Sequence, residues 1–504
     1  MTGKRKHWAG YLCIWSLTML FGILLGGTMH INDGFWHVAV GRQIWETGLI
    51  PRTAVGAWDA GSLSWIPQEW LYAVIVAGLF DGNLNAFCVF SFLCMSFAWF
   101  LAGIYARLPE RLFDKLVPVL VYVYAGSVML AGFLTARPQT VSILLFTVFL
   151  YLFRQMVQGE RLLWKQKAVL FGLVVFWANV HAGTVILAYV IPLCCIAFCW
   201  FCRLVPQVAK WMLPASLTPG VSRNLSSIGL ISVLGTFLTP NGVLGFLYPY
   251  VSLGDSRMLS AVSEWAAPSV TELSGLLGFY IPLVAVLFWM VFVWSSSQKV
   301  ASWDMVCLAA CFGMGLLHQR MVLYLYFVLV LCWTPYLKRH VRRWSFVCRR
   351  GFGGLCKMVS LILFVCNVCM VYQMDHASEG VSNPEFFETV KAKAGDRMYN
   401  FYDIGGVCLY YDIPVFVDSR YDPYSSTRMD AVFVLEEQDS SSDAVSQVMD
   451  AYQFTSILDL SDSTAVAWAK SNGWQRVTKW DTGLVQTKAS GQRPVVYEFW
   501  VPGS

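Results

Sequence analysis

The sequence predicts a polytopic α-helical membrane protein with a small C-terminal α/β domain. Three observations indicate this fold class. Of the 504 residues, 57% are hydrophobic and only 13% are charged, about half the charged fraction of an average soluble protein. Several apolar runs are long enough to cross a bilayer. From Asp375 onward the chain is polar and contains only short apolar runs.

About eleven apolar runs fit a membrane span of roughly 20 residues, some of them being shorter. They cover residues 9–29, 84–105, 116–134, 138–156, 168–180, 182–202, 224–240, 273–296, 303–318, 320–337 and 356–374. The predicted membrane domain is therefore 1–374, with an outer loop at 30–83. Within that loop, Trp70–Phe80 is apolar but too short to span, which favours a helix lying at the membrane interface.

Lys and Arg residues gather in alternate loops. The basic segments are Lys4–Lys6, the loops 107–115, 154–167, 203–223 and 338–357, and the turn at Lys299. Because cytoplasmic loops are enriched in these residues, we expect a multi-pass protein of the cell membrane with a cytoplasmic N-terminus. The loop 30–83, the loop 240–272 and the C-terminal tail then lie outside. The first apolar run lacks a cleavage site before a soluble domain, so we interpret it as a retained anchor.

Residues 375–504 are expected to form an extracytoplasmic α/β domain, since about 130 residues suffice for an independent core. Strand-like runs occur at Val415–Val417, Ser456–Leu460 and Val495–Trp500, and helix-like runs at 443–452 and 463–472.

Other classes of protein fit the composition poorly. Most of the 15 Cys lie in or beside apolar runs, where they behave as small apolar residues. Their spacing indicates neither a disulfide scaffold nor a zinc site. The net charge of +5 follows the loop pattern described above, which argues against a nucleic-acid partner.

Polar side chains recur in the segments that this topology places at the outer face. They are Asp33, His37, Arg42, Asp59 and Glu69 in the first loop, and Arg137, Asn179, His181, Glu264 and Arg320 near later turns. Ionisable groups at a bilayer are costly and usually serve a site. The pattern therefore predicts one site at the outer face, built from separate segments.

Asp33 is the first candidate for a catalytic residue. A carboxylate can take the proton of a hydroxyl acceptor as that hydroxyl attacks a sugar. A phosphate leaving group on a membrane lipid needs cations, and Arg137, His181 or Arg320 would supply them. The structural alternative is that Asp33 only caps a helix starting near Phe35.

The other candidates have structural alternatives too. His37 and its neighbour Trp36 fit an interfacial anchor. Arg137 fits a contact with a lipid headgroup or a helix end, and His181 a turn. Arg320 fits a side chain that reaches toward the headgroups.

The same motifs resemble a bacterial family of polytopic membrane proteins related to GT-C glycosyltransferases. That family is more distantly related to the catalytic subunits of oligosaccharyltransferases and to protein mannosyltransferases. The resemblance rests on an ordered set of motifs over nearly the whole chain: Asp33–Thr53, Trp65–Leu71, Arg137–Gln139, Trp177–His181, Thr239–Gly242 with Glu264–Trp265, Gln319–Arg320, Tyr402–Gly406, Val417–Tyr424 and Gly473–Trp474.

The resemblance implies a GT-C-like fold and a glycosyltransferase that uses a polyprenyl-phosphate-linked sugar on the outer face. It implies that Asp33 is the catalytic acid of the first loop, and that Tyr402 and Asp403 lie on the acceptor side. The acceptor would be a glycan, a lipid or a protein of the cell envelope. Ala54 and Ala182 depart from the family pattern, which leaves open whether a divalent metal (Mg²⁺ or Mn²⁺) is bound.

Two other functions stay open on the sequence. One is a transporter or flippase for a lipid-linked or polar solute, although the charges gather at one face and no half-to-half similarity is visible. The other is a non-catalytic envelope assembly protein. For the tail, structural alternatives are a turn at Gly405–Gly406 and an internal ion pair between Asp418 and Arg420.

Overall fold

The computed structural model describes residues 2–26, 31, 33–111, 116–159, 161–254, 263–295, 298–337, 352–378, 383–436, 440–488 and 491–503. Contacts divide the chain into two compact units. The first unit consists of Met1–Thr28, Val89–Leu134 and Pro138–Val371; the second consists of Met29–Cys88, Thr135–Arg137 and Tyr372–Ser504. The first loop and the tail thus share one unit. Whether 1–374 and 375–504 fold independently stays a prediction.

The named elements of the first unit are all helices, and its described residues also include one isolated bridge between Met212 and Val300. Its longer helices are α1 (Thr2–Gly26), most of α4 (Leu84–Tyr105), α6 (Leu116–Phe133), α7 (Pro138–Gln158), α8 (Trp164–Val180), α10 (Leu187–Leu204), α12 (Pro219–Thr236), α13 (Gly242–Gly254), α16 (Ile281–Ser295), α17 (Ser302–Leu317), α18 (Val322–Val328) and α19 (Phe352–Ser378). Short helices join them: α5 (Leu108–Arg111), α9 (Ala182–Val185), α11 (Pro206–Ala209), η2 (Pro214–Leu217), η3 (Ser263–Trp265), α15 (Leu273–Gly275), η4 (Leu276–Tyr280), η5 (Gln319–Met321), η6 (Leu329–Trp333) and η7 (Thr334–Tyr336).

Six helical segments among the described residues are long and apolar enough to cross a membrane. They are Trp8–Gly26, Leu84–Tyr105, Leu116–Phe133, Pro138–Gln158, Ala182–Leu204 and Leu273–Ser295. The other five predicted runs are also mainly helical, but the apolar helices Ser302–Leu317 and Lys357–Gln373, for example, are shorter. A polytopic helical architecture is therefore confirmed, and the count of eleven spans stays a prediction.

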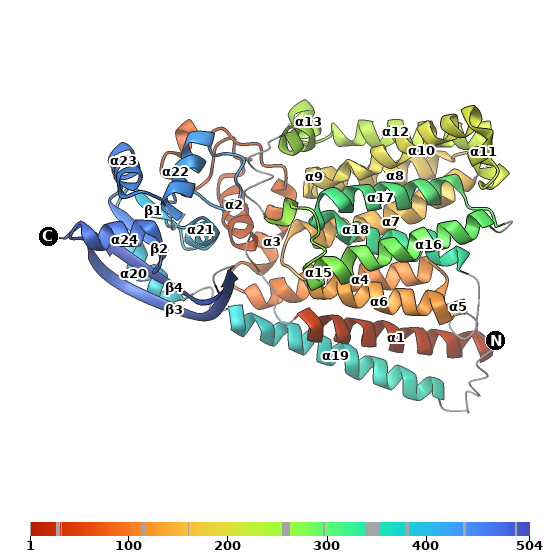
Figure 1. Cartoon of the computed structure of the whole chain (residues 1–504), viewed down its shortest axis with the longest axis horizontal. Coiled ribbons are helices and arrows are strands. Elements are labelled where there is room, and N and C mark those ends of the chain that lie inside the picture. The colour runs from red at the N-terminus through yellow and green to blue at the C-terminus, as the bar shows by residue number, and fades with distance from the viewer. Residues whose placement is uncertain are drawn as a thin grey trace. The chain divides into compact units, whose positions relative to one another are not determined.

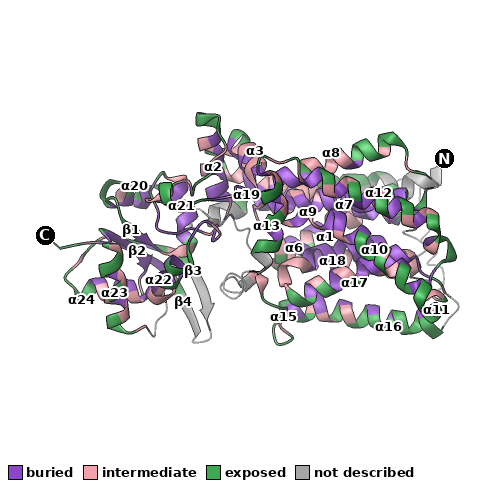
Figure 2. Cartoon of the chain, turned by 90° about the horizontal axis from the view of Figure 1, so that it is seen from above, coloured by how far each residue is buried: buried purple, intermediate pink, exposed green. Residues whose placement is uncertain are grey.

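Two contacts show how the helices of this unit pack. Figure 1 shows α1 and α19 side by side; Trp15 stacks on Phe364, and the Asn367 amide donates to the Ser16 carbonyl. Every residue of α18 is buried (Figure 2). A helix that is apolar all round belongs in the interior of a bundle.

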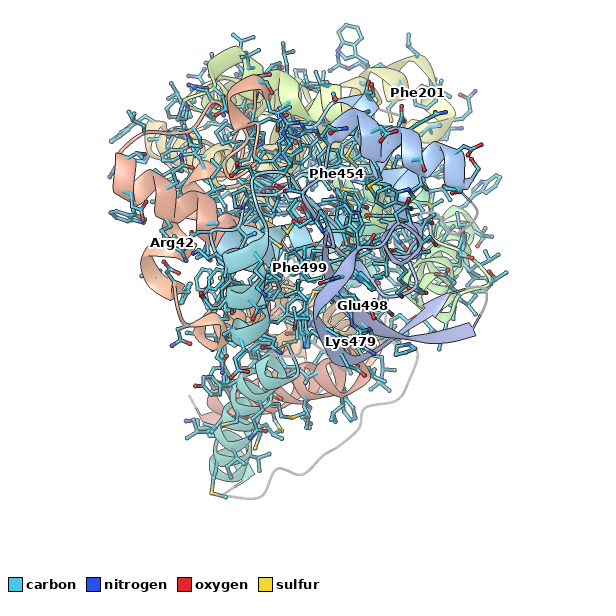
Figure 3. The ribbon with its side chains drawn as sticks, turned by 90° about the vertical axis from the view of Figure 1, so that its left-hand side faces the viewer. Arg42, Phe201, Phe454, Lys479, Glu498 and Phe499 are labelled. Atoms are coloured by element: carbon cyan, nitrogen blue, oxygen red, sulfur yellow. The ribbon has the colours of Figure 1, made fainter. Side chains whose placement is uncertain are left out.

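The second unit contains a mixed sheet and short helices (Figure 1). Its elements are α2 (Gly34–Thr47), η1 (Ala60–Ser62), α3 (Trp70–Phe80), α20 (Pro384–Lys393), β1 (Met398–Asn400), η8 (Tyr402–Ile404), α21 (Gly405–Tyr410), α22 (Ser426–Glu436), α23 (Ser442–Tyr452), β2 (Ser456–Leu460), α24 (Thr464–Ser471), β3 (Gln475–Lys488) and β4 (Gly491–Val501). The strand order is β1-β2-β4-β3, with only β1 and β2 parallel. Lys479 and Glu498 mark the paired long strands in Figure 3.

Most of the elements predicted for the tail are present, including both helices, β2 and the strand at 495–500. The predicted strand Val415–Val417 is wrong. Only Val415 forms a bridge, with Ala57 of the first loop. The Phe416 N–H instead donates to the side-chain oxygen of Asn400, 2.8 Å away, so no strand ladder continues there.

Two glycines allow close contacts that position the candidate site. A Cβ on Gly41 of α2 would lie 2.0 Å from the Ala73 carbonyl oxygen of α3. A Cβ on Gly405 would lie 2.2 Å from the Val417 carbonyl oxygen. The predicted turn at Gly405–Gly406 is wrong, because these two residues are the first of α21. Glycine at 405 allows α21 to approach the backbone of residues 417–418.

Candidate functional site

Asp33 occupies the N-cap position of α2, but its side chain makes no capping hydrogen bond. One carboxylate oxygen accepts a hydrogen bond from the Ser419 hydroxyl at 2.6 Å. The other lies 3.2 Å from Nε of Arg137. The Asp33 side chain is 24% exposed and that of Arg137 is 13% exposed. The carboxylate is thus held in place by a hydroxyl and a cation while staying accessible.

A second carboxylate, that of Asp403 on η8, interacts electrostatically with Asp33. The Asp403 residue is exposed, yet protein atoms crowd its carboxyl. This loss of hydration and the negative charge of Asp33 raise the pKa of Asp403, while Arg137 lowers it. Burial, and then the charge of Asp33, raise the pKa of the adjacent Tyr402 hydroxyl. Asp33, Arg137, Tyr402 and Asp403 therefore form one polar site in the second unit.

His37 supports the backbone of Asp33. Its Nδ1 lies 2.7 Å from the Asp33 carbonyl oxygen, and its Nε2 lies 2.7 Å from Glu69 Oε2. Its ring stacks on Trp36 with centroids 3.6 Å apart. Both His37 and Trp36 are buried, so an interfacial-anchor role for them is wrong. Contacts with Asp33, Glu69 and Trp36 therefore fix the orientation of the His37 ring.

The segment Asp418–Tyr424, which includes Ser419, also contains a buried cluster of hydrogen-bonded side chains. The Arg420 guanidinium bonds both carboxylate oxygens of Asp418, and the Tyr424 hydroxyl also donates to Asp418. The predicted ion pair between Asp418 and Arg420 is therefore confirmed. Burial and the charges of Glu69 and Asp418 raise the pKa of Asp422 to about 8, although Arg420 opposes the shift.

Arg42 makes contacts that are structural in character. It donates two hydrogen bonds to the Asp81 carboxylate, at 3.0 and 2.9 Å, and one to Asp412 at 3.0 Å. Asp59, another polar residue predicted for the first loop, accepts a hydrogen bond from Arg428 at 2.9 Å. The pairs Arg42–Asp412 and Asp59–Arg428 thus connect the first loop to the tail within the second unit.

The remaining candidates belong to the first unit. The guanidinium of Arg320 lies over the Trp265 ring at 4.7 Å and donates to the side-chain oxygen of Gln139. The Trp265 carbonyl oxygen is 2.7 Å from Nδ1 of His318. Three turns thus meet around Arg320, so its side chain is engaged by protein groups.

His181 lies between α8 and α9, and its Nδ1 is 2.8 Å from the Ser142 hydroxyl. Asn179 donates to the carbonyls of Val175 and Leu238, which is a structural contact. Glu264 lies on η3, beside Trp265. Ser142 and Gln139 are three residues apart on α7, so His181 and Arg320 bond one face of the same helix.

Sequence reasoning missed Ser419 as the group that bonds Asp33. The only sequence signal was its place inside the motif Val417–Tyr424. It also missed Glu436, whose carboxylate accepts the Tyr402 N–H at 3.0 Å. Within the described ranges, no three His, Cys, Asp or Glu side chains are placed to hold a metal ion; Mg²⁺ or Mn²⁺ binding stays an open prediction.

Comparison with protein families and with curated proteins finds no match. Solved structures do match. The apo form of the Archaeoglobus fulgidus oligosaccharyltransferase has a TM-score of 0.51 at 10% identity, over 89% of this chain and 69% of that chain.

Two further oligosaccharyltransferase structures from Archaeoglobus fulgidus each match 96% of this chain and 74% of their own, at 9% identity. One is the oligosaccharyltransferase AglB in complex with an inhibitory peptide and a dolichol-phosphate, with a TM-score of 0.47. The other is tethered to an acceptor peptide and has a TM-score of 0.49. The match to the apo form, with its TM-score of 0.51, shows that the fold of this chain is similar to that of an archaeal oligosaccharyltransferase.

Proposed function

We propose that this protein is a membrane glycosyltransferase that moves a sugar from a polyprenyl-phosphate-linked donor to a hydroxyl acceptor. The observation that carries the proposal is the state of the Asp33 carboxylate. It occupies a helix N-cap but does not cap; a hydroxyl and a guanidinium hold it, and it stays partly exposed beside a second carboxylate. The oligosaccharyltransferase-like fold is consistent with this reaction class, although fold alone does not assign an activity.

The reaction assigns one task to each group. Asp33 takes the proton of the acceptor hydroxyl while the hydroxyl oxygen bonds to the anomeric carbon. The bond from that carbon to the phosphate oxygen breaks, and the electron pair leaves with the lipid phosphate. Arg137 stabilises negative charge beside Asp33. Tyr402 and Asp403 are proposed to contact the acceptor.

We also propose that Arg320 and His181 of the first unit bind the phosphate of the lipid donor. A guanidinium that already stacks on an aromatic ring and bonds a neutral amide keeps its full positive charge, which suits a phosphate. We propose outer-face transfer, following the positive-inside pattern of the loops.

The test compares Asp33→Asn with Asp450→Asn, a matched change at an exposed position of α23. Full-length protein in liposomes receives a panel of polyprenyl-phosphate-linked radiolabelled sugars and membrane extract as the acceptor source. Loss of the general base should lower transfer by about 100-fold or more, with donor binding retained and the Asp450 variant unaffected. Asp33→Asn with near-normal transfer would contradict the proposal, as would movement of donor across the bilayer without sugar transfer.

A further inference from the structure

Three large apolar side chains are exposed together in the second unit. Trp45 of α2 is 63% exposed, Leu49 just after α2 is 71% exposed, and Leu79 of α3 is 65% exposed. Arg42, labelled in Figure 3, lies one helical turn before Trp45. Clustered apolar exposure of this kind marks an interaction surface.

Contacts between α2 and α3 place Trp45 against α3, close to Leu79. The Trp45 indole N–H donates to the Val74 carbonyl at 3.0 Å. A Cβ on Gly78 would lie 3.1 Å from the Trp45 ring, so the ring packs directly against α3 next to Leu79. Leu49 follows Gly48, which ends α2 in a left-handed conformation. The indole N–H is satisfied within the protein, and the apolar part of the ring stays outside.

A short stretch of chain connects this surface to a candidate membrane span. Helix α3 ends at Phe80, and α4, a candidate membrane span, begins at Leu84. The first residues of α4, up to Cys88, belong to the same compact unit as α3. Leu79 is therefore at most about 17 Å of extended chain from the start of the span. Trp, like Tyr, is enriched at membrane–water interfaces.

We propose that Trp45, Leu49 and Leu79 form a membrane-contact patch that inserts into the interface of the bilayer crossed by α4. One end of α2 carries Trp45 and the other end carries Asp33. The two residues are twelve positions apart, which corresponds to about 18 Å along the helix axis. The patch would hold the Asp33 carboxylate at a set height above the lipid phosphates. That last consequence rests on the proposed function; the membrane contact does not.

The test uses the photoreactive amino acid benzoylphenylalanine in the full-length protein. It replaces Leu79 or Leu49 in the two test variants. Phe97 of α4, 49% exposed in a candidate span, is the positive control, and Leu484 of β3, 38% exposed, is the negative control. The protein is placed in liposomes of phosphatidylcholine and phosphatidylglycerol, irradiated, and analysed by mass spectrometry.

Lipid adducts at positions 79 and 49, in yields close to those at 97, with none at 484, are the expected result. Adducts to another protein chain, or no adducts at 79 while 97 reacts, would overturn the proposal. A second measurement covers misfolding of these variants: brominated lipids should quench the tryptophan fluorescence of the wild type more than that of Trp45→Phe. Equal quenching would count against the patch. Neither readout depends on sugar transfer.

Discussion

Asp33 uses its backbone and its side chain for different purposes. Its carbonyl oxygen accepts from both the backbone N–H and Nδ1 of His37, at 3.2 and 2.7 Å. Because a carbonyl oxygen only accepts hydrogen bonds, Nδ1 of His37 carries the proton in this contact. The other ring nitrogen, Nε2, contacts the Glu69 carboxylate. The backbone is thereby clamped while the carboxylate faces Ser419 and Arg137. This division of contacts would fix the position of Asp33 for the proposed general-base role while leaving its carboxylate accessible.

Asp422 makes stability depend on pH. Its pKa of about 8 in the folded protein lies above the ordinary value of 3.8, so the folded state holds a proton that the unfolded state has released. Between about pH 4 and pH 8 the folded state binds more protons, and stability therefore falls as pH rises. Asp422→Asn should flatten this decline in thermal unfolding measured from pH 5 to 8. If the stability of the wild type and of the variant falls equally with pH, Asp422 does not have the raised pKa.

At the scale of elements, α7 has polar contacts at both ends. Near its C-terminal end, Arg154 lies 3.1 Å from the buried Asp304 of α17 and also donates to the Leu331 carbonyl of η6. The Tyr336 hydroxyl donates to the same Asp304 oxygen at 2.6 Å. This cluster joins three segments that are far apart in the sequence, including the π-helical turn that follows α18.

A double replacement tests that cluster. Arg154→Met alone leaves a buried carboxylate without its cation and should cost about 3–5 kcal/mol of unfolding free energy. Arg154→Met combined with Asp304→Leu removes both charges and should recover most of that loss. Thermal unfolding of the purified protein in detergent measures both. A double variant as unstable as the single one would show that the loss did not come from the unpaired carboxylate.

The elements themselves follow largely from local pattern, whereas their partners do not. Apolar runs predicted the helices because a bilayer requires self-contained backbone bonding. Val415–Val417 reads as a strand by composition, yet its partners are Ala57 and Asn400, and no local rule points to either. The sequence alone suggests that Arg42 binds a ligand, but in the fold it pairs with Asp81 and Asp412.

At the scale of the whole molecule, the parity of the spans decides where the termini lie. Eleven spans place the N-terminus and the tail on opposite sides of the membrane, whereas six would place both on one side. Reporter fusions at each end should show a cytoplasmic N-terminus and an extracytoplasmic C-terminus. Both reporters on the same side would reject the odd number of spans and, with it, the predicted position of the tail.

The hydrogen bond between Ser419 and Asp33 joins residues that are 386 positions apart. A ribosome adding about 5–20 residues per second needs roughly 20–80 s to make that stretch. For all that time a nascent chain already holds Asp33 but lacks its hydroxyl partner. The proposed site therefore cannot be complete until residue 419 has been made. A chain that stops before Ser419 would keep the contact between Asp33 and Arg137 but lack the hydroxyl partner, and under the proposed function it should be inactive.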